Sequence, residues 1–337
     1  MQTPYQTIRR FLRSISAALF QLCFLAVVAV FFAHYLLVGD KEAELGFLKI
    51  TNAHEHVISG AAALRYAAEA RKEKITRTVL LGSSEATLVP GQTEFRHTDE
   101  NNLEVLELAA RFPEQFIAVP TLDPADPAKL DKLKDYVHLG ARGLKLYGGH
   151  QFFHQAPLND AGMDEVYRYA QAHGLPVVMH VNTGLYLDEF ERVLGKYPDL
   201  NVVCPHFCLS VSQLERLERL MKTYPHLYLD TSFGFVDFLK EAMVRMTLQS
   251  SQFRDFVTRY QDRILFGTDL VVTNEGYKTP AWMAGMLRAY RNMLEQKEYT
   301  FKEIPGMVLR GLDLDWPVLK KIYDENSRKL FGAPLKA

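Results

Sequence analysis

The chain has 337 residues, of which 39 are Lys or Arg and 40 are Asp or Glu, giving a formal net charge of −1. This balance excludes the strongly basic surface that nucleic-acid binding requires. A hydrophobic content of 48%, with 12% aromatic residues, excludes a mostly disordered or collagen-like chain and leaves one large barrel or two smaller domains.

The first forty residues differ in composition from the rest of the chain. Three arginines, the last of them Arg13, precede an uncharged and mostly apolar run from Ile15 to Val38, and no acidic residue occurs before Asp40. A helix of that length reaches about 36 Å, enough to cross a hydrocarbon core of about 30 Å. We therefore predict that residues 1–40 form a cytoplasmic tail and a membrane anchor, with residues 15–38 in the membrane.

The same arginines predict the orientation of the anchor. By the positive-inside rule they keep the amino terminus in the cytoplasm, so the remainder of this single-pass protein is expected on the outer, periplasmic or extracellular, side. A cleaved signal peptide is the main alternative. Its apolar region is usually about 7 to 15 residues long and ends in small residues, and neither feature is found before Asp40. A buried core helix is the remaining alternative.

From residue 45 to residue 335, short apolar runs alternate with longer segments of helical periodicity, a pattern typical of parallel strands joined by crossover helices. Eight runs are expected to be strands: Leu48–Ala53, Thr78–Gly82, Phe116–Thr121, Gly143–Tyr147, Pro176–Val181, Val202–His206, Leu227–Thr231 and Ile264–Thr268. We predict that residues 45–335 form one α/β domain, a TIM (β/α)₈ barrel with extra helices after the eighth strand. A doubly wound open sheet is the alternative, but the Gly-rich turn expected after its first strand is missing.

Residues that bind metals or move protons stand at the carboxyl ends of several of these strands, where barrel enzymes place their active sites. His54 and His56 are two positions apart, so on an extended chain their side chains point the same way and Glu55 points oppositely. Two adjacent imidazoles favour a borderline metal such as zinc. Equivalent positions on other strands hold Lys145, His180, His206 and Asp269.

For other residues at this end of the barrel, the sequence gives weaker evidence of a role in the site. Lys145 can pair with a carboxylate or stand beside the metal. His150 and His154 follow the fourth strand and are candidate substrate contacts. Several aromatic residues point to a partly apolar substrate, although loop packing explains them equally well. These residues are Tyr147, Phe152, Phe153, Phe233 and Phe235.

The cysteines say little about the compartment. If Cys204 and Cys208 both lie on one extended strand, they stand about 13 Å apart, which exceeds the reach of a disulfide. We therefore expect free thiols.

Taken together, these motifs resemble those of the amidohydrolase superfamily of metal-dependent barrel hydrolases, most closely the branch that contains amidohydrolase-type decarboxylases and lactonases. The similarity covers most of residues 45–332. It rests on the segments Asn52–His56, Gly143–Tyr147, Pro176–His180, Cys204–His206, Ile264–Asp269 and Glu325–Gly332.

The resemblance implies that His54, His56 and His180 bind a metal and that Asp269 binds it or orients its water. His206 is then a further ligand or a hydrogen-bonding neighbour. Lys145 matches a position that in some relatives is a carbamylated lysine bridging two metals, so one or two divalent ions, Zn²⁺ or Mn²⁺, are compatible with the sequence. Asn52 stands where the family often has aspartate, and this departure predicts looser support for the ligands.

The resemblance also implies hydrolysis of a small ester, lactone or amide by metal-activated water. Asp269 would act as general base and then acid, His206 would stabilise the oxyanion, and Lys145 would assist at the metal. Non-oxidative decarboxylation of a small carboxylic acid is the alternative reaction, and a non-catalytic, membrane-tethered binding protein is a third interpretation. The sequence identifies neither the substrate nor the oligomeric state.

Overall fold

The structure is a computed structural model that describes residues 25–26, 49–89 and 95–332. The predicted anchor, residues 15–38, therefore lies almost entirely outside the described residues. Within the described ranges, no helix is both long enough and apolar enough to cross a membrane. The chain divides into two compact units, and the second, Lys49–Ala337, contains all of the described strands.

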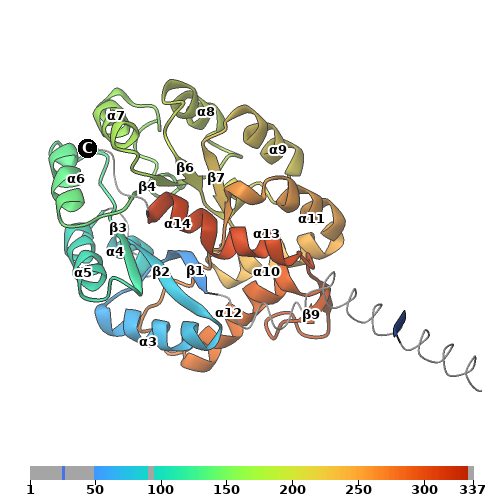
Figure 1. Ribbon diagram of the computed structural model, residues 1–337. Coiled ribbons are helices and arrows are strands. Elements are labelled where there is room, and N and C mark those ends of the chain that lie inside the picture. The colour runs from blue at the N-terminus through green and yellow to red at the C-terminus, as the bar shows by residue number, and fades with distance from the viewer. Residues whose placement is uncertain (1–24, 27–48, 90–94, 333–337) are drawn as a thin grey trace, which may run out of the picture. The chain divides into compact units, whose positions relative to one another are not determined.

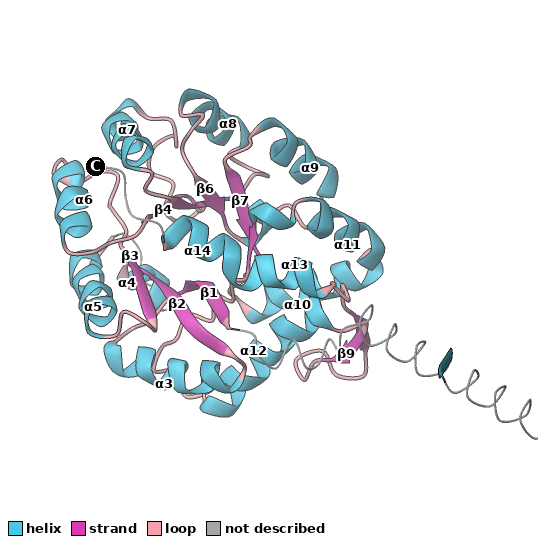
Figure 2. Ribbon diagram, viewed as in Figure 1, coloured by secondary structure: helices cyan, strands magenta, loops and turns pink. Residues whose placement is uncertain are grey.

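Eight parallel strands follow one another in sequence order and are surrounded by helices (Figures 1 and 2). They are β1 (Ile50–Glu55), β2 (Ile75–Leu81), β3 (Phe116–Val119), β4 (Leu144–Gly149), β5 (Val177–Val181), β6 (Val202–Cys204), β7 (Leu227–Asp230) and β8 (Ile264–Leu265). A parallel bridge between Thr121 and Lys145 joins the end of β3 to β4. The backbone N–H of Ala53 donates to the carbonyl of Phe266, which joins β1 to the end of β8. The ring is thereby closed, and the predicted barrel is confirmed.

Five strands, β3 and β5 to β8, are shorter than the sequence predicts, and β6 and β8 differ most among those that carry site residues. β6 ends at Cys204 because Pro205 has no N–H to continue the ladder, and His206 consequently lies in a tight turn instead of on the strand. All four residues of the turn His206–Leu209 have a positive φ. β8 covers only Ile264–Leu265, although the chain beyond it continues along β1.

The turn after β6 also contradicts the prediction of free thiols. Cys204 and Cys208 form a disulfide, with their Cα atoms 5.1 Å apart. The prediction assumed one extended strand, whereas the turn after Pro205 brings the two Cα atoms within the roughly 4.4–6.8 Å that a disulfide spans. His206 therefore lies inside a short, covalently closed loop.

The helices pack around the outside of the strands. In α8 (Leu187–Lys196), Phe190, Val193 and Leu194 recur at helical spacing and are buried against the barrel. The other helices are α3 (Gly60–Lys72), α4 (Glu85–Leu88), α5 (Thr98–Arg111), α6 (Lys129–His138), α7 (Asp164–His173), α9 (Leu214–Thr223), α10 (Val236–Leu248), α11 (Ser250–Arg259), α12 (Pro280–Glu295), α13 (Trp316–Lys320) and α14 (Asn326–Phe331). A short antiparallel hairpin, β9 (Glu298–Thr300) with β10 (Val308–Arg310), follows α12 and was not predicted.

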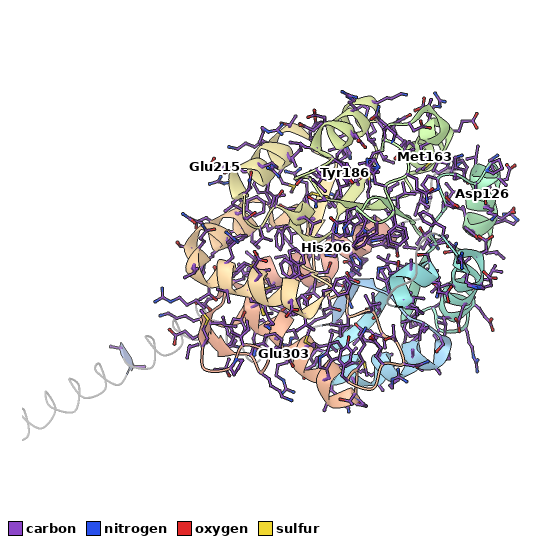
Figure 3. The ribbon with its side chains drawn as sticks, turned by 180° about the vertical axis from the view of Figure 1, so that it is seen from behind. Asp126, Met163, Tyr186, His206, Glu215 and Glu303 are labelled. Atoms are coloured by element: carbon purple, nitrogen blue, oxygen red, sulfur yellow. A yellow bond between two sulfur atoms is a disulfide. The ribbon has the colours of Figure 1, made fainter. Side chains whose placement is uncertain are left out.

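The predicted extra helices close the end of the barrel at which the strands begin. The side-chain amide of Asn326 in α14 donates to the carbonyl of Ile264, and Leu330 and Phe331 belong to the central apolar core. Figure 1 shows α13 and α14 lying across this end. Figure 3 views the molecule from behind, where His206 lies near the middle of the ring of helices. The loops at the carboxyl ends of the strands therefore surround the candidate site.

Candidate active site

Three buried side chains, two from the end of β1 and one from the loop after β8, meet at the carboxyl end of the barrel. The Nε2 atoms of His54 and His56 lie 3.3 Å apart, so the two side chains point the same way, as predicted. Asp269 follows β8, and its Oδ1 lies 3.7 Å from Nε2 of His54 and 3.6 Å from Nε2 of His56. One ligand atom from each residue lies within 4.8 Å of the others, which makes this group able to hold a metal ion.

The two remaining predicted histidines stand beside this group. Nε2 of His206 lies 3.7 Å from the second oxygen of Asp269, Oδ2, and its ring centroid lies 5.3 Å from that of His54. His180, at the end of β5, lies beyond His206 as seen from His54, and its ring centroid is 4.9 Å from that of His206. The structure thus brings all four histidines to one face, with His54, His56 and Asp269 at the centre.

The hydrogen bonds of the imidazoles assign their protons. Nδ1 of His54 lies 2.6 Å from Oδ2 of Asp230, Nδ1 of His56 lies 3.2 Å from the carbonyl of Leu81, and Nδ1 of His206 lies 3.0 Å from the carbonyl of Ser232. Carbonyl oxygens and an ionised carboxylate only accept hydrogen bonds, so each Nδ1 carries the proton. Each Nε2 therefore presents a lone pair to the centre of the site.

This arrangement fits a cation. The lone pairs of His54 and His56 face each other across 3.3 Å, which is repulsive unless a positive charge lies between them. Oδ1 of Asp269 is buried and has no hydrogen-bond partner among the described residues. Two imidazole nitrogens and a carboxylate oxygen are ligands that zinc accepts. The residues present therefore suit a divalent metal.

Burial keeps these histidines in the neutral form that binds metals. It lowers the pKa of His54 to about 4 and that of His206 to about 3, with the charge of Lys145 contributing in both cases. The pKa values of His56 and His180 are also held well below the ordinary value, chiefly by burial. Burial raises the pKa of Asp269, an effect that a bound cation would oppose.

Asp230, at the end of β7, is a site residue that the sequence analysis missed. Its Oδ2 accepts the Nδ1–H of His54, and its Oδ1 accepts the backbone N–H of His206 at 3.0 Å and the hydroxyl of Ser232 at 2.6 Å. Burial raises the pKa of Asp230, but the charge of His54 and these hydrogen bonds outweigh that effect and lower it. The signal was present, because Asp230 closes the apolar strand β7 just as the other site residues close theirs.

Residues on the opposite side of β1 support the loop that carries Asp269. The Oε1 of Glu55 accepts the backbone N–H groups of His56 and Val271, and its Oε2 accepts the hydroxyl of Thr268. Asn52 donates to the hydroxyls of Tyr66 and Thr268 and accepts the N–H of His54. Glu55 thus points away from the metal group as predicted. Asn52 joins β1 to the end of β8, and the looser support expected from this departure stays a prediction.

Lys145 lies on β4 with its ammonium group 4.8 Å from the ring centroid of Tyr147. The side chain is 1% exposed, and burial lowers its pKa to about 8, although Asp269 and Asp230 oppose the shift. The charges of Asp269 and Asp230 act on Lys145, so this lysine lies in the same site as His54, His56 and Asp269. Its role as a metal ligand stays a prediction.

The remaining candidates divide between the site and the surface. His150 follows β4 with its ring 4.6 Å from that of His180, and Gly149 permits this approach because a Cβ there would lie 2.4 Å from the carbonyl oxygen of His180. His154 instead bonds to Glu189 of α8. Of the aromatic residues, Tyr147, Phe153 and Phe233 are buried, whereas Phe152 and Phe235 are exposed.

A family model described as amidohydrolase matches residues 54–333 of this chain. A search of curated proteins finds no match. Among solved structures, one similar to this chain is a probable 2-pyrone-4,6-dicarboxylic acid hydrolase from Acinetobacter baumannii, with 14% identity, a TM-score of 0.58, and coverage of 85% of this chain and 100% of that one.

Two further solved structures share the fold. An amidohydrolase from Burkholderia multivorans with bound zinc has 13% identity and a TM-score of 0.55, covering 85% of this chain and 100% of that one. A 2,6-dihydroxybenzoate decarboxylase complexed with 2,6-dihydroxybenzoate has 16% identity and a TM-score of 0.54, covering 85% of this chain and 99% of that one. At these identities the similarity shows a common barrel fold.

Proposed function

Because this chain belongs to the amidohydrolase family, we propose that it is a metal-dependent hydrolase of a small ester, lactone or amide. The observation that carries the proposal is the buried Oδ1 of Asp269, which has no hydrogen-bond partner among the described residues and faces Nε2 of both His54 and His56. These three residues would hold the metal, and zinc or manganese is the ion we expect. His180 and His206 border the same space and are candidates for further ligands.

A divalent ion such as Zn²⁺ polarises a carbonyl group and lowers the pKa of water toward about 7. Asp269 would accept the proton of the attacking water and later pass it to the leaving group. The Nδ1–H of His206 is directed at the carbonyl of Ser232, so Nε2 carries no proton to donate. This favours a ligand role for His206 over the stabilisation of an oxyanion.

The test combines metal content with turnover. We expect about one zinc or manganese per chain by plasma mass spectrometry, and hydrolysis of at least one compound in a panel of esters, lactones and amides. Asp269→Asn should abolish turnover while retaining substantial metal. Asp164→Asn, which alters an aspartate paired with Lys196 on the outside of the barrel, is the matched control. Full activity of Asp269→Asn, or no metal after reconstitution, would contradict the proposal.

Non-oxidative decarboxylation of a small carboxylic acid is the second candidate. The buried ammonium of Lys145 favours it, because no described residue forms an ion pair with it and a carboxylate substrate would supply that negative charge. Product analysis separates the two reactions. Carbon dioxide released without uptake of labelled oxygen from water would establish decarboxylation, and incorporation of that oxygen into the product would establish hydrolysis.

We also propose that residues 15–38 anchor the protein in a membrane, with the barrel on the outer side. The disulfide between Cys204 and Cys208 supports this placement, because disulfides persist mainly in oxidising compartments. Protease treatment of intact and lysed cells tests the placement. The barrel should be cleaved in intact cells or, if it is periplasmic, once the outer membrane has been opened to give spheroplasts. Its protection until the cytoplasmic membrane is lysed would refute the orientation.

A further inference from the structure

Lys145 is a buried cation whose charge is not matched by a direct partner within the ranges that the structure describes. Its ammonium group forms no hydrogen bond or ion pair with any residue in the described part of the chain and only faces the ring of Tyr147. An ammonium removed from water is costly unless it is paired and hydrogen-bonded. The carboxylates of Asp230 and Asp269 influence Lys145 electrostatically, but both belong to the metal group and its support. Among the described residues, Lys145 therefore lacks an anion of its own.

His150 places a second donor on the same side of the site. Its Nδ1 accepts the backbone N–H of Phe152 at 3.2 Å, so in the neutral ring Nε2 carries the proton. No hydrogen-bond partner of that Nε2–H is found among the residues described here. The ring lies 4.6 Å from that of His180 and is one residue beyond the strand that carries Lys145. A donor N–H and a cation thus come from one strand and the loop that follows it.

The surroundings of these two groups are aromatic on one side. The ring of Tyr147 lies 5.0 Å from that of Phe153, and Phe153 lies 5.4 Å from His150. The metal group lies on the other side, because His180 contacts both His150 and His206. An anion between Lys145 and His150 would therefore be next to the reacting centre. The rest of the molecule that carries this anion could pack against the aromatic rings.

The geometry points to an anion subsite in which the Lys145 ammonium and the His150 Nε2–H bind a carboxylate group of the substrate. This inference rests on the proposed function, since it concerns the substrate of the same site. It narrows the substrate class to compounds that carry a carboxylate beside the bond that reacts. A charge-assisted hydrogen bond is stronger than a neutral one, and donors on two different residues would hold the carboxylate in one orientation.

Binding of matched ligands tests the subsite without any need for turnover. Benzoate and benzamide have nearly the same shape and differ in charge, so we would measure their dissociation constants by ligand-observed NMR on the full-length protein. Lys145→Met should weaken benzoate binding by at least about tenfold and change benzamide binding by less than about twofold. Lys132→Met removes a lysine charge on the outer helix α6 and should leave both ligands unaffected.

A second variant keeps the inference testable if Lys145→Met folds poorly. His150→Phe retains an aromatic ring but removes the N–H donor, and it should weaken benzoate by about threefold to tenfold with little effect on benzamide. Equal losses for the two ligands, or no loss in either variant, would overturn the subsite. Loss of metal in Lys145→Met, together with a carbamate on Lys145 detected with isotopically labelled bicarbonate, would make Lys145 a ligand and would also overturn it. If the wild type binds no metal but still prefers benzoate to benzamide, the proposed function would be refuted and the subsite would stand.

Discussion

Replacing Asp230 with asparagine tests how the protein prepares the histidines. Oδ1 of Asp230 accepts from the backbone N–H of His206 and from both the N–H and the hydroxyl of Ser232, whereas Oδ2 accepts only from His54 within this set. In Asp230→Asn the amide oxygen should keep the three donors, which leaves the NH₂ group facing Nδ1 of His54. Two N–H groups cannot bond to each other, so His54 must move its proton from Nδ1 to Nε2.

A proton on Nε2 of His54 would block metal binding, and this determines the size of the expected loss of metal affinity. Nε2 of His54 is one of the atoms that would hold the metal, and a protonated Nε2 has no lone pair to offer. Loss of a carboxylate that orients a metal-binding histidine typically costs about 10- to 100-fold in metal affinity. The variant also exchanges a hydrogen bond to a charged acceptor at 2.6 Å for a neutral one from the amide, which should lower the free energy of unfolding by about 1 kcal/mol.

Competition with a chelator of known affinity measures the first effect, and unfolding by urea in the presence of EDTA measures the second. Nitrogen NMR of the imidazoles would report the change of tautomer directly. Asp164→Asn serves again as the control, because its carboxylate pairs with Lys196 between the outer helices α7 and α8. Metal affinity of Asp230→Asn within about twofold of the wild type would refute the reasoning.

Three further predictions concern the loops and the pH dependence. Gly234 has a φ of +72°, and a Cβ there would lie 2.8 Å from Oδ2 of Asp269. Gly234→Ala should therefore weaken metal binding and lower the melting temperature. Gly276 has open space around it, so Gly276→Ala should change neither. Reduction of the disulfide should weaken metal binding in a chelator assay because the left-handed turn that carries His206 loses its closure; a Cys208→Ser variant that still responds to reductant would contradict this. In EDTA, thermal stability should fall as the pH drops from about 6.5 toward 4: the pKa of His54 is depressed to about 4 in the folded protein, so the unfolded chain binds protons first. A melting temperature that is constant or rises over this range would show that His54 titrates normally.

The features that the sequence predicts correctly are those with a local signal. The apolar runs that became β1 to β8 are short and recur between segments of helical periodicity, so their order and parallel direction follow from composition and spacing. His54 and His56 lie on one side of β1 because the alternation of a strand is a property of adjacent residues. The ends of the strands are less well predicted, since Pro205 moves His206 from the strand into a turn.

The sequence by itself determined that this chain is an α/β barrel with histidines and an aspartate at the carboxyl ends of its strands. Only the tertiary structure decided which partner each of them has. Asp230 meets His54 across 176 positions of the chain, and the disulfide depends on a turn that brings Cys204 and Cys208 together. The ammonium group of Lys145 faces the ring of Tyr147 and bonds to no other residue in the described part of the chain, which depends on what surrounds it in space. Periodicity and spacing describe neighbours along the chain, whereas proton positions, charge pairing and burial depend on groups that come together only when the barrel closes.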